Sequence, residues 1–271
     1  MKRAKKKVAK RPVAKKKPIK AKAAKKTAKK ASAVKKPAVT NGAGRMKADG
    51  TVTWNFKLLS HHTLQGFGGM GEGMSVQIAP DGRRVIWLAH ESAPKNFTAV
   101  DVSDPRKPKV ICQTDLPTSH MRSNSLETCG NIMAVAYQTQ KKGQQPAGME
   151  LFDISNPEKP RSISFYDCSG EHSRGVHQLW FCDGEYVHMA SSSADFVPTH
   201  PQDDQFYRII DVRNPSKPTE VGRWHMPGTK QGDNVPPPPR HPLDKGYRAH
   251  NCNVYPPVSY THLTLPTIYS V

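Results

Sequence analysis

The chain has 271 residues and a formal net charge of +19 at pH 7. This length accommodates one large domain or two small ones. The charge is concentrated at one end: residues 1–40 hold 18 of the 41 basic residues and no acidic residue, which leaves 23 basic against 22 acidic residues in the rest. The basicity therefore belongs to a tail. No stretch approaches about 18 consecutive apolar residues, so the sequence predicts no membrane-spanning helix.

The tail, residues 1–46, is a low-complexity segment of Lys, Ala, Val and Pro without an aromatic residue. It can bury too little apolar surface to offset the entropy of ordering, and its like charges repel, so we expect disorder. Its lysine clusters predict sequence-independent binding to nucleic-acid phosphates. The clustered lysines are Lys5, Lys6, Lys7, Lys15, Lys16, Lys17, Lys25 and Lys26. The alternative interpretation is a solubilising or mis-started extension, with Met46 as the true start.

One motif of the form D-[VI]-x-[DN]-P-x-K-P occurs three times. The copies are "AVDVSDPRKPKVI" (99–111), "LFDISNPEKPRSI" (151–163) and "IIDVRNPSKPTEV" (209–221). Asp101, Asp153 and Asp211 lie 52 and 58 residues apart, a period that indicates repeated supersecondary units of the size of a propeller blade. In each copy an apolar strand leads into a turn formed by Asp or Asn before Pro, and the second Pro prevents a helix. We therefore predict that the three aspartates form turns and are not catalytic acids.

Each motif is the corner of one hairpin and is preceded by another. The strands that leave the corners are predicted at 109–116, 161–167 and 219–226. The preceding hairpins are 74–92 with its turn at Gly82, 124–140 with Gly130 and 176–192 with Gly184. Four strands per unit and no credible helix predict an all-β fold: a partial β-propeller of three four-stranded blades and the start of a fourth, within residues 47–257.

The stretch "GVHQLWFCDGEYVHMASSS…RIIDVRNPSKPTEVGRW" resembles the LVIVD-repeat family, in which a G-x-Y-x-Y-V strand precedes an I-V-D-V-S-D-P corner. The resemblance covers residues 74–255 and implies a β-propeller. It implies no particular activity, because a shared fold does not transfer a function. The chain departs from the family pattern in long insertions at 193–205 and 227–248, and in a first blade that lacks a preceding motif.

The fourth unit opens with "GYRAHNCNVYPP" (246–257) and is followed by "VSYTHLTLPTIYSV" (258–271) in place of the expected turn and motif. The last segment resembles the translation of a transposon-end sequencing adaptor. We therefore expect residues 258–271 to be non-native and the chain to be a fragment of a longer propeller. The alternative is a divergent closing strand.

Two histidines are the strongest candidates for a site. Alignment of the units on their glycine turns places His177 at the start of an inner strand, with Ser75 and Ser123 in the same place in the first two units. His250 opens the next unit in that place. Inner strands of a propeller face the central channel, so we expect both imidazoles to lie near each other there.

Two converging neutral imidazoles can bind a transition metal such as Zn, Cu or Fe. His172, five residues before His177, and Cys252, two residues after His250, are the predicted further ligands. The alternative is that these histidines make ordinary hydrogen bonds to neighbouring blades, because two ligands without a third define no site.

A glycine-rich segment, "GFGGMGEG" (66–73), matches the G-x-G-x-x-G pattern of dinucleotide-binding proteins. That fingerprint requires a helix next, whose N-terminus holds the pyrophosphate, whereas a strand and a turn follow here. We therefore predict no dinucleotide site and interpret the segment as a flexible connection at the channel mouth. No common hydrolase or kinase signature is present.

Two functions of different class follow from these patterns. The first is a scaffold whose channel holds an unknown protein or small-molecule ligand, with a tail that interacts with nucleic acid. The second is a metal-dependent enzyme, an oxidoreductase among the options, with a histidine-lined channel site. Five cysteines without a CxxC pair or a repeated spacing favour reduced thiols and a cytoplasmic location.

Deletion of residues 1–40 should abolish binding of the chain to duplex DNA, because the remaining residues are almost neutral. Binding by the full chain should be independent of DNA sequence and should fall steeply with salt. Fluorescence anisotropy with two unrelated duplexes at several salt concentrations measures both properties. Equal binding by the shortened protein would show that the body carries the activity.

Overall fold

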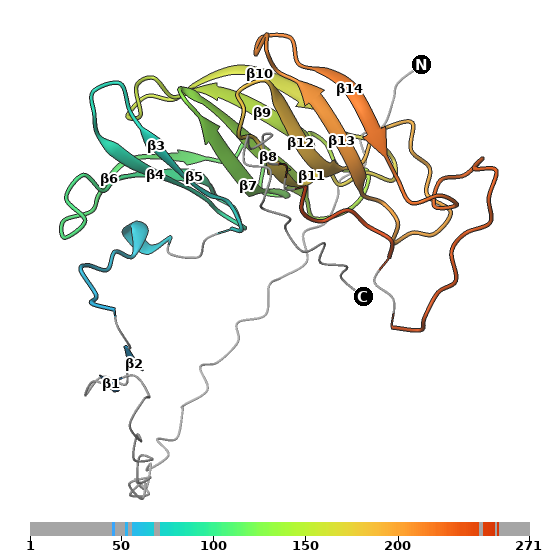
Figure 1. Cartoon of the computed structure of the whole chain (residues 1–271), viewed down its shortest axis with the longest axis horizontal. Coiled ribbons are helices and arrows are strands. Elements are labelled where there is room, and N and C mark those ends of the chain that lie inside the picture. Colours follow the sequence, from blue (N-terminus) through green and yellow to red (C-terminus); the bar gives the residue numbers. More distant parts are fainter. Residues whose placement is uncertain are drawn as a thin grey trace, which may run out of the picture. The chain divides into compact units, whose positions relative to one another are not determined.

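The structure is a computed structural model (Figure 1). The residues it describes are 45–46, 52–53, 56–67, 71–243, 246–252 and 254. The lysine clusters of the tail and the segment 258–271 lie outside these residues, as do most of the expected tail 1–46 and the end of the expected propeller fragment. Two short strands, β1 (Arg45–Met46) and β2 (Val52–Thr53), pair with each other in a unit that ends at Lys57.

Three four-stranded antiparallel sheets make up the second unit, which begins at Leu58. Blade 1 contains β3 (Met74–Ile78), β4 (Arg84–Ala89), β5 (Lys95–Asp101) and β6 (Lys109–Asp115). Blade 2 contains β7 (Met121–Cys129), β8 (Ile132–Thr139), β9 (Gly148–Asp153) and β10 (Arg161–Asp167). Blade 3 contains β11 (Val176–Trp180), β12 (Tyr186–Ser191), β13 (Phe206–Asp211) and β14 (Thr219–Trp224). The predicted all-β fold with three blades is confirmed.

Helical structure within the described residues is limited to one short 3-10 turn, η1 (Leu64–Gly66). Nowhere in that part of the chain is there a helix of the length and apolarity needed to cross a membrane.

The repeated motif forms the same turn in every blade. The carboxylates of Asp101, Asp153 and Asp211 each accept a hydrogen bond from the backbone N–H two residues later, at 2.9, 2.8 and 3.0 Å. The Asp or Asn before the first proline accepts a second such bond, and its carbonyl closes a turn with the lysine of the motif. The prediction that these three aspartates form turns is therefore confirmed.

The hairpin that precedes each motif turns at a glycine with positive φ. Gly82, Gly130 and Gly184 have φ values of 83°, 57° and 80°. This region of backbone conformation is strained for a residue with a Cβ, which explains why glycine recurs at the predicted turns.

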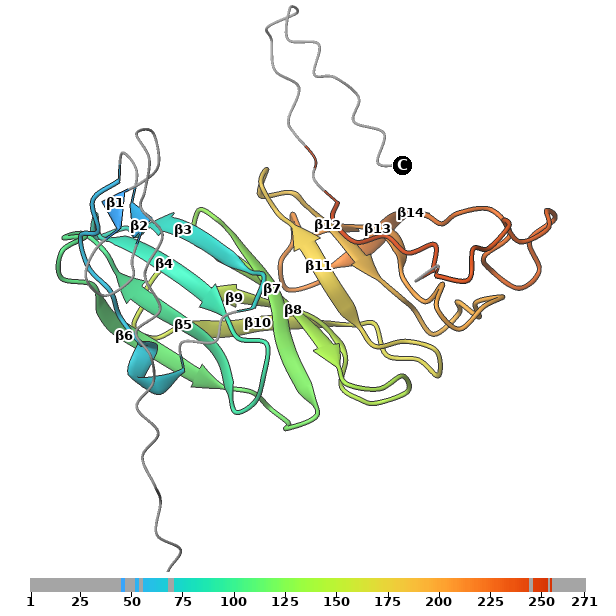
Figure 2. The ribbon, with the colours of Figure 1, turned by 90° about the horizontal axis from the view of Figure 1, so that it is seen from below.

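Neighbouring blades contact each other through residues one repeat apart, and the inner strands β3, β7 and β11 follow one another (Figure 2). Between blades 1 and 2, Ser75 Oγ lies 2.8 Å from Thr128 Oγ1. Between blades 2 and 3, the Asn124 side chain donates to the carbonyl of His177 at 2.7 Å. Both pairs are 53 residues apart in sequence, and both join the inner strands of successive blades.

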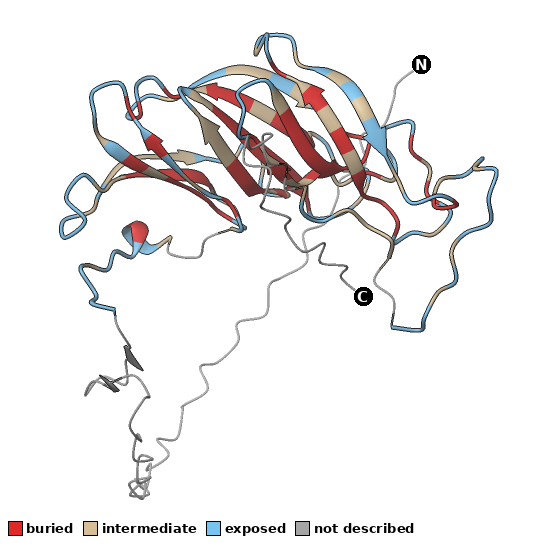
Figure 3. Ribbon diagram, viewed as in Figure 1, coloured by how far each residue is buried: buried red, intermediate tan, exposed pale blue. Residues whose placement is uncertain are grey.

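Most of the core lies in two apolar layers, one between each pair of blades, and a third, smaller cluster contains Leu64, Leu88 and Val100 (Figure 3). Strand β8 separates the two layers because its side chains alternate: Met133, Val135 and Tyr137 face blade 1, and Ala134 and Ala136 face blade 3. All five side chains are at most 1 % exposed. The apolar side chains of these layers are thus buried by contact between neighbouring blades.

The opposite face of β3 has no such neighbour among the described residues. Met74, Val76 and Ile78 are 58, 60 and 75 % exposed, whereas Gln77, on the side of blade 2, is 2 % exposed. The alternation along β3 is therefore that of a strand made to pack on both sides, with one side open to solvent.

The described residues of the fourth unit, 246–252 and 254, form no strand. They nevertheless lie against β11: the Trp180 indole N–H donates to the carbonyl of Val254 at 2.6 Å, across a sequence separation of 74 residues. This separation exceeds the 53 residues of the earlier pairs because the insertion 227–248 intervenes. The segment occupies the place beside β11 that β11 occupies beside β7.

Asp153 should make stability sensitive to acid. Its carboxylate accepts hydrogen bonds from Ser155 and lies against Arg161, which lowers its pKa from 3.8 to about 2 in the folded chain. Its stabilising contribution is therefore complete above about pH 4 and lost as the pH falls toward 2. In Asp153→Asn, which keeps the accepting oxygen but does not titrate, the fall of the unfolding free energy between these pH values should be shallower.

Urea denaturation at several pH values measures this difference. Asp153→Ala, which also loses the turn hydrogen bond, should be less stable at pH 7 by about 1 kcal/mol. Parallel pH profiles for the parent and Asp153→Asn would contradict the assignment.

Candidate metal centre

A β-bulge sets the position of His177. In β11 the register with β12 shifts between Val176 and Gln178, so His177 is the extra residue of the bulge. Strand β7 has the same shift between Ser123 and Ser125, with Asn124 as the extra residue. The structural equivalent of His177 in blade 2 is therefore Asn124. The expectation that Ser123 holds this place was wrong by one residue, because Asn124 lies six residues before Gly130 whereas His177 lies seven residues before Gly184.

The structure brings His177 and His250 together. Their Nε2 atoms are 3.0 Å apart, and their ring centroids are 4.5 Å apart with an angle of 79° between the ring planes. The two residues belong to β11 and to the segment that lies beside it, so they meet across a unit boundary although 73 residues separate them in sequence.

Glu72 is the third member of this cluster, and the sequence patterns did not reveal it. One carboxylate oxygen of Glu72 and one ring nitrogen of each histidine all lie within 4.8 Å of one another. The side chain of Gln178 helps to hold the Glu72 carboxylate, because its amide nitrogen donates to Glu72 Oε2 at 2.7 Å. We call Glu72, His177 and His250 the central cluster.

Glu72 reaches the cluster because its glycine neighbours pack closely between blades 1 and 2. The Gly71 N–H donates to the carbonyl of Ala89 at 2.8 Å, and the Glu72 N–H donates to that of Asn124 at 3.2 Å. A Cβ on Gly73 would lie 2.3 Å from the backbone nitrogen of Leu126. The end of the glycine-rich segment is thus tied to two strands, in contrast to the flexible connection expected, and β3 follows it directly, as the rejection of a dinucleotide site required.

The other two predicted ligands are not in the cluster. Cys252 lines a cavity with Tyr207, Trp224 and His250 but is not one of the residues that converge in the cluster, and burial raises the pKa of its thiol to about 12. Its two-residue offset from His250 does not place it on the same face, because the described residues there form no strand. His172 lies in the turn that precedes β11, so its distance from His177 along the chain does not follow an extended strand.

The comparison with protein families agrees with the repeat architecture. The model of the LVIVD repeat matches residues 203–225, which comprise β13, the Asp211 corner and β14. The chain therefore carries an LVIVD repeat in its third blade. No curated protein matches the chain.

Within this LVIVD-repeat chain, the electrostatics of the central cluster favour neutral His177. Burial lowers its pKa to about 4, and the proximity of His250 contributes to this shift. The carboxylate of Glu72 acts in the opposite direction, whereas Arg122 and Arg248 lower the pKa further. At pH 7 the ring therefore has a lone pair available on one nitrogen.

The hydrogen-bond partners of Nδ1 determine which nitrogen of His177 carries this lone pair. His177 Nδ1 lies 3.3 Å from Oε1 of Gln138 and 3.1 Å from the amide nitrogen of Asn124. When Nδ1 carries the proton and donates to Gln138, the lone pair is on Nε2 and points toward His250. The Asn124 amide is satisfied in this arrangement as well, because it also donates to the carbonyl of His177.

Removal of His250 should raise the pKa of His177, because both the neighbouring ring and part of the burial are lost. In metal-free protein we expect the C2 proton of His177 to titrate near pH 4 in the parent and closer to 6.5 in His250→Ala. NMR titration of the histidine ring protons measures both values. His61→Ala, which removes an exposed ring outside the cluster, should leave His177 unchanged. An unchanged value in His250→Ala would contradict the arrangement.

Proposed function

We propose that this protein is a β-propeller-like scaffold that binds one transition-metal ion through Glu72, His177 and His250. The observation that carries the proposal is the 3.0 Å separation of the two Nε2 atoms with a carboxylate oxygen in reach of both. Two nitrogens that each lie about 2.0–2.1 Å from one ion are about 2.9–3.4 Å apart. The two rings thus need little movement to share an ion.

The chemistry of the three side chains supports Zn²⁺, Fe²⁺ or Cu²⁺. Imidazole suits all three metals, and two histidines with one carboxylate recur in sites for zinc and for non-haem iron. Three protein ligands leave coordination positions open for a further ligand. Metal-dependent catalysis is for this reason the second candidate function: an ion bound there would supply a Lewis acid or a redox centre.

A hydrogen bond between the two rings accounts for the same 3.0 Å separation in metal-free protein. The two interpretations differ in what Glu72 does. A ring-to-ring hydrogen bond requires no carboxylate, whereas a metal site requires its charge. Glu72→Gln separates them, because it keeps the oxygen that accepts from Gln178 and removes only the charge.

Titration of the chelator-treated chain, residues 1–271, with Zn²⁺, and with Co²⁺ as a spectroscopic probe, should show one bound ion. His177→Ala should lose this binding, and Glu72→Gln should weaken it about tenfold or more. His120→Ala is the matched control, because His120 is a partly exposed ring bonded to the carbonyl of Gln145, outside the cluster. Circular dichroism of each variant establishes that the β structure is retained. Equal binding by His177→Ala and the parent would overturn the proposal.

A second proposed interaction, sequence-independent binding to nucleic acid, rests on the 18 basic residues within 1–40. It requires no contact with the central cluster, and the deletion described above tests it separately. Cytoplasmic function is part of the proposal, since Cys112, Cys129, Cys168, Cys182 and Cys252 are all free thiols, as expected in a reducing compartment.

A further inference from the structure

A cavity of about 400 Å³ adjoins the central cluster and shares both of its histidines. Three arginines line it, and they come from three places in the chain: Arg122 from β7, Arg174 from the turn before β11 and Arg248 from the fourth unit. The other residues that line it are Gln138, His177, Gln205, Gly246, Ala249 and His250. We call this space the arginine cavity.

The positive charge around the arginine cavity exceeds the negative charge. One carboxylate, Asp204, lies 3.5 Å from Arg174 Nε and 2.9 Å from Arg248 Nε. The same carboxylate also pairs with Lys142 at 3.2 Å. Arg122 has only a distant acidic partner, Glu91 at 3.9 Å. Four cations thus share two carboxylates.

Much of this charge is removed from solvent. The side chain of Asp204 is 3 % exposed, and those of Arg122, Arg174 and Arg248 are 26–32 % exposed. Burial lowers the pKa of Arg248, and the neighbouring Arg174 lowers it further, although Asp204 opposes both effects. Like charges held together at partial burial are unfavourable unless an anion completes the group.

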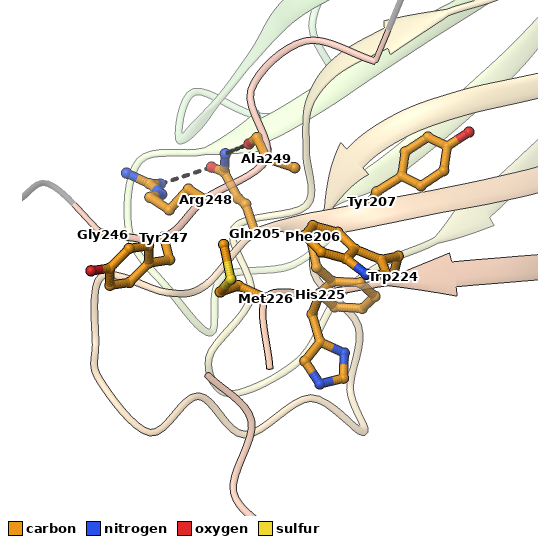
Figure 4. Close-up of a pocket in the computed structure, with 10 residues that line it drawn as sticks. All are labelled: Gln205, Phe206, Tyr207, Trp224, His225, Met226, Gly246, Tyr247, Arg248 and Ala249. Carbon is orange, nitrogen blue, oxygen red and sulfur yellow. Dashed lines mark hydrogen bonds between the residues drawn. The ribbon is translucent and has the colours of Figure 1, made fainter. Parts of the chain in front are cut away.

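Amide side chains hold the guanidinium groups in place without neutralising them. Gln205 Oε1 accepts from Arg248 at 2.8 Å and from Arg174 at 3.3 Å. Gln205 also donates to the carbonyl of Ala249 at 3.2 Å, which fixes the start of the fourth unit (Figure 4). Gln138 Oε1 accepts from Arg122 at 2.7 Å. Neutral amides thus help to position all three arginines, of which Arg174 and Arg248 also share Asp204, and the charge of Arg122 is the least compensated.

We propose that the arginine cavity binds a small anion that carries carboxylate or phosphate groups, and that a ligand there lies beside an ion bound by His177 and His250. Guanidinium groups recognise both kinds of oxyanion through paired hydrogen bonds. Three guanidinium groups that line one cavity favour an anionic ligand. The proposal names a ligand class for the function proposed above and rests on it only for the contact with the ion, because the arginines bind an anion without metal.

The two long insertions contribute to this cavity. Asp204 and Gln205 lie at the end of the insertion 193–205, and Arg248 lies where the insertion 227–248 runs into the fourth unit. A second buried carboxylate of the first insertion, Asp203, pairs with Arg240 of the second and accepts from the backbone N–H of Tyr247 at 2.8 Å. The insertions are therefore fastened to each other next to the arginine cavity. This is the arrangement expected of added segments that carry binding residues.

Calorimetric titration of the whole 271-residue chain with succinate and with inorganic phosphate tests the proposal at low ionic strength. Each probe is added to chelator-treated and to zinc-loaded protein. We expect saturable binding of at least one probe, and the preferred probe identifies the oxyanion. Arg122→Gln should weaken this binding about tenfold or more. Arg122 is the residue of choice because Arg174 and Arg248 also hold the buried Asp204, and their loss endangers the fold.

Arg106→Gln is the matched control, because Arg106 lies exposed in the turn of the first motif. The basic tail is present in every variant, so its own anion binding cancels in the comparison. The absence of saturable binding of both probes, or equal binding by Arg122→Gln and the parent, overturns the anion site. Zinc binding without anion binding would sustain the proposed function alone, and anion binding without zinc binding would sustain the arginine cavity alone.

Discussion

The packing of each blade against the next is the interaction on which the rest of this structure depends. A single sheet cannot bury both of its faces by itself. Blade 2 has both faces buried because it lies between two other blades: Met133, Val135 and Tyr137 lie against blade 1, and Ala134 and Ala136 lie against blade 3. Tyr137 also links blades 1 and 2 through hydrogen bonds. Its hydroxyl accepts from the Asn96 amide of blade 1 at 2.7 Å and donates to the Glu150 carboxylate of its own blade at 2.8 Å. Folding of one blade is thus coupled to the presence of its neighbours.

The central cluster is a product of that packing. Its members come from the connection before blade 1, from blade 3 and from the fourth unit, and none of them contacts another within its own sheet. Glu72 in particular arrives through the close approach of Gly73 to β7, so a change in the packing of blades 1 and 2 moves a carboxylate relative to rings held by blade 3 and its neighbour. Stability and site geometry depend here on the same contacts.

The fold was largely predictable because its signals are local. The strand expected at 161–167 is β10, Arg161–Asp167, and the glycine turns and Asp-Pro corners lie where the repeats placed them. The meeting of His177 with His250 also follows from the repeat, since equivalent positions of successive units approach each other near the axis. The identity of the third residue does not: Glu72 depends on how near two backbones come, which no spacing in the sequence records. The assignment of Ser123 in place of Asn124 failed because a count from the turn cannot see where a bulge inserts its extra residue.

The bulge has one more consequence. In blades 2 and 3 it places one side chain of the inner strand next to the following unit, that of Asn124 in blade 2 and that of His177 in blade 3. From this position the Asn124 side chain donates a hydrogen bond to the carbonyl of His177, whereas His177 directs the lone pair of Nε2 toward His250. The same bulged backbone thus carries side chains of different chemistry in blades 2 and 3. A repeat protein of this kind can gain or lose a ligand by substitution at one position without disturbing the layers that keep it folded.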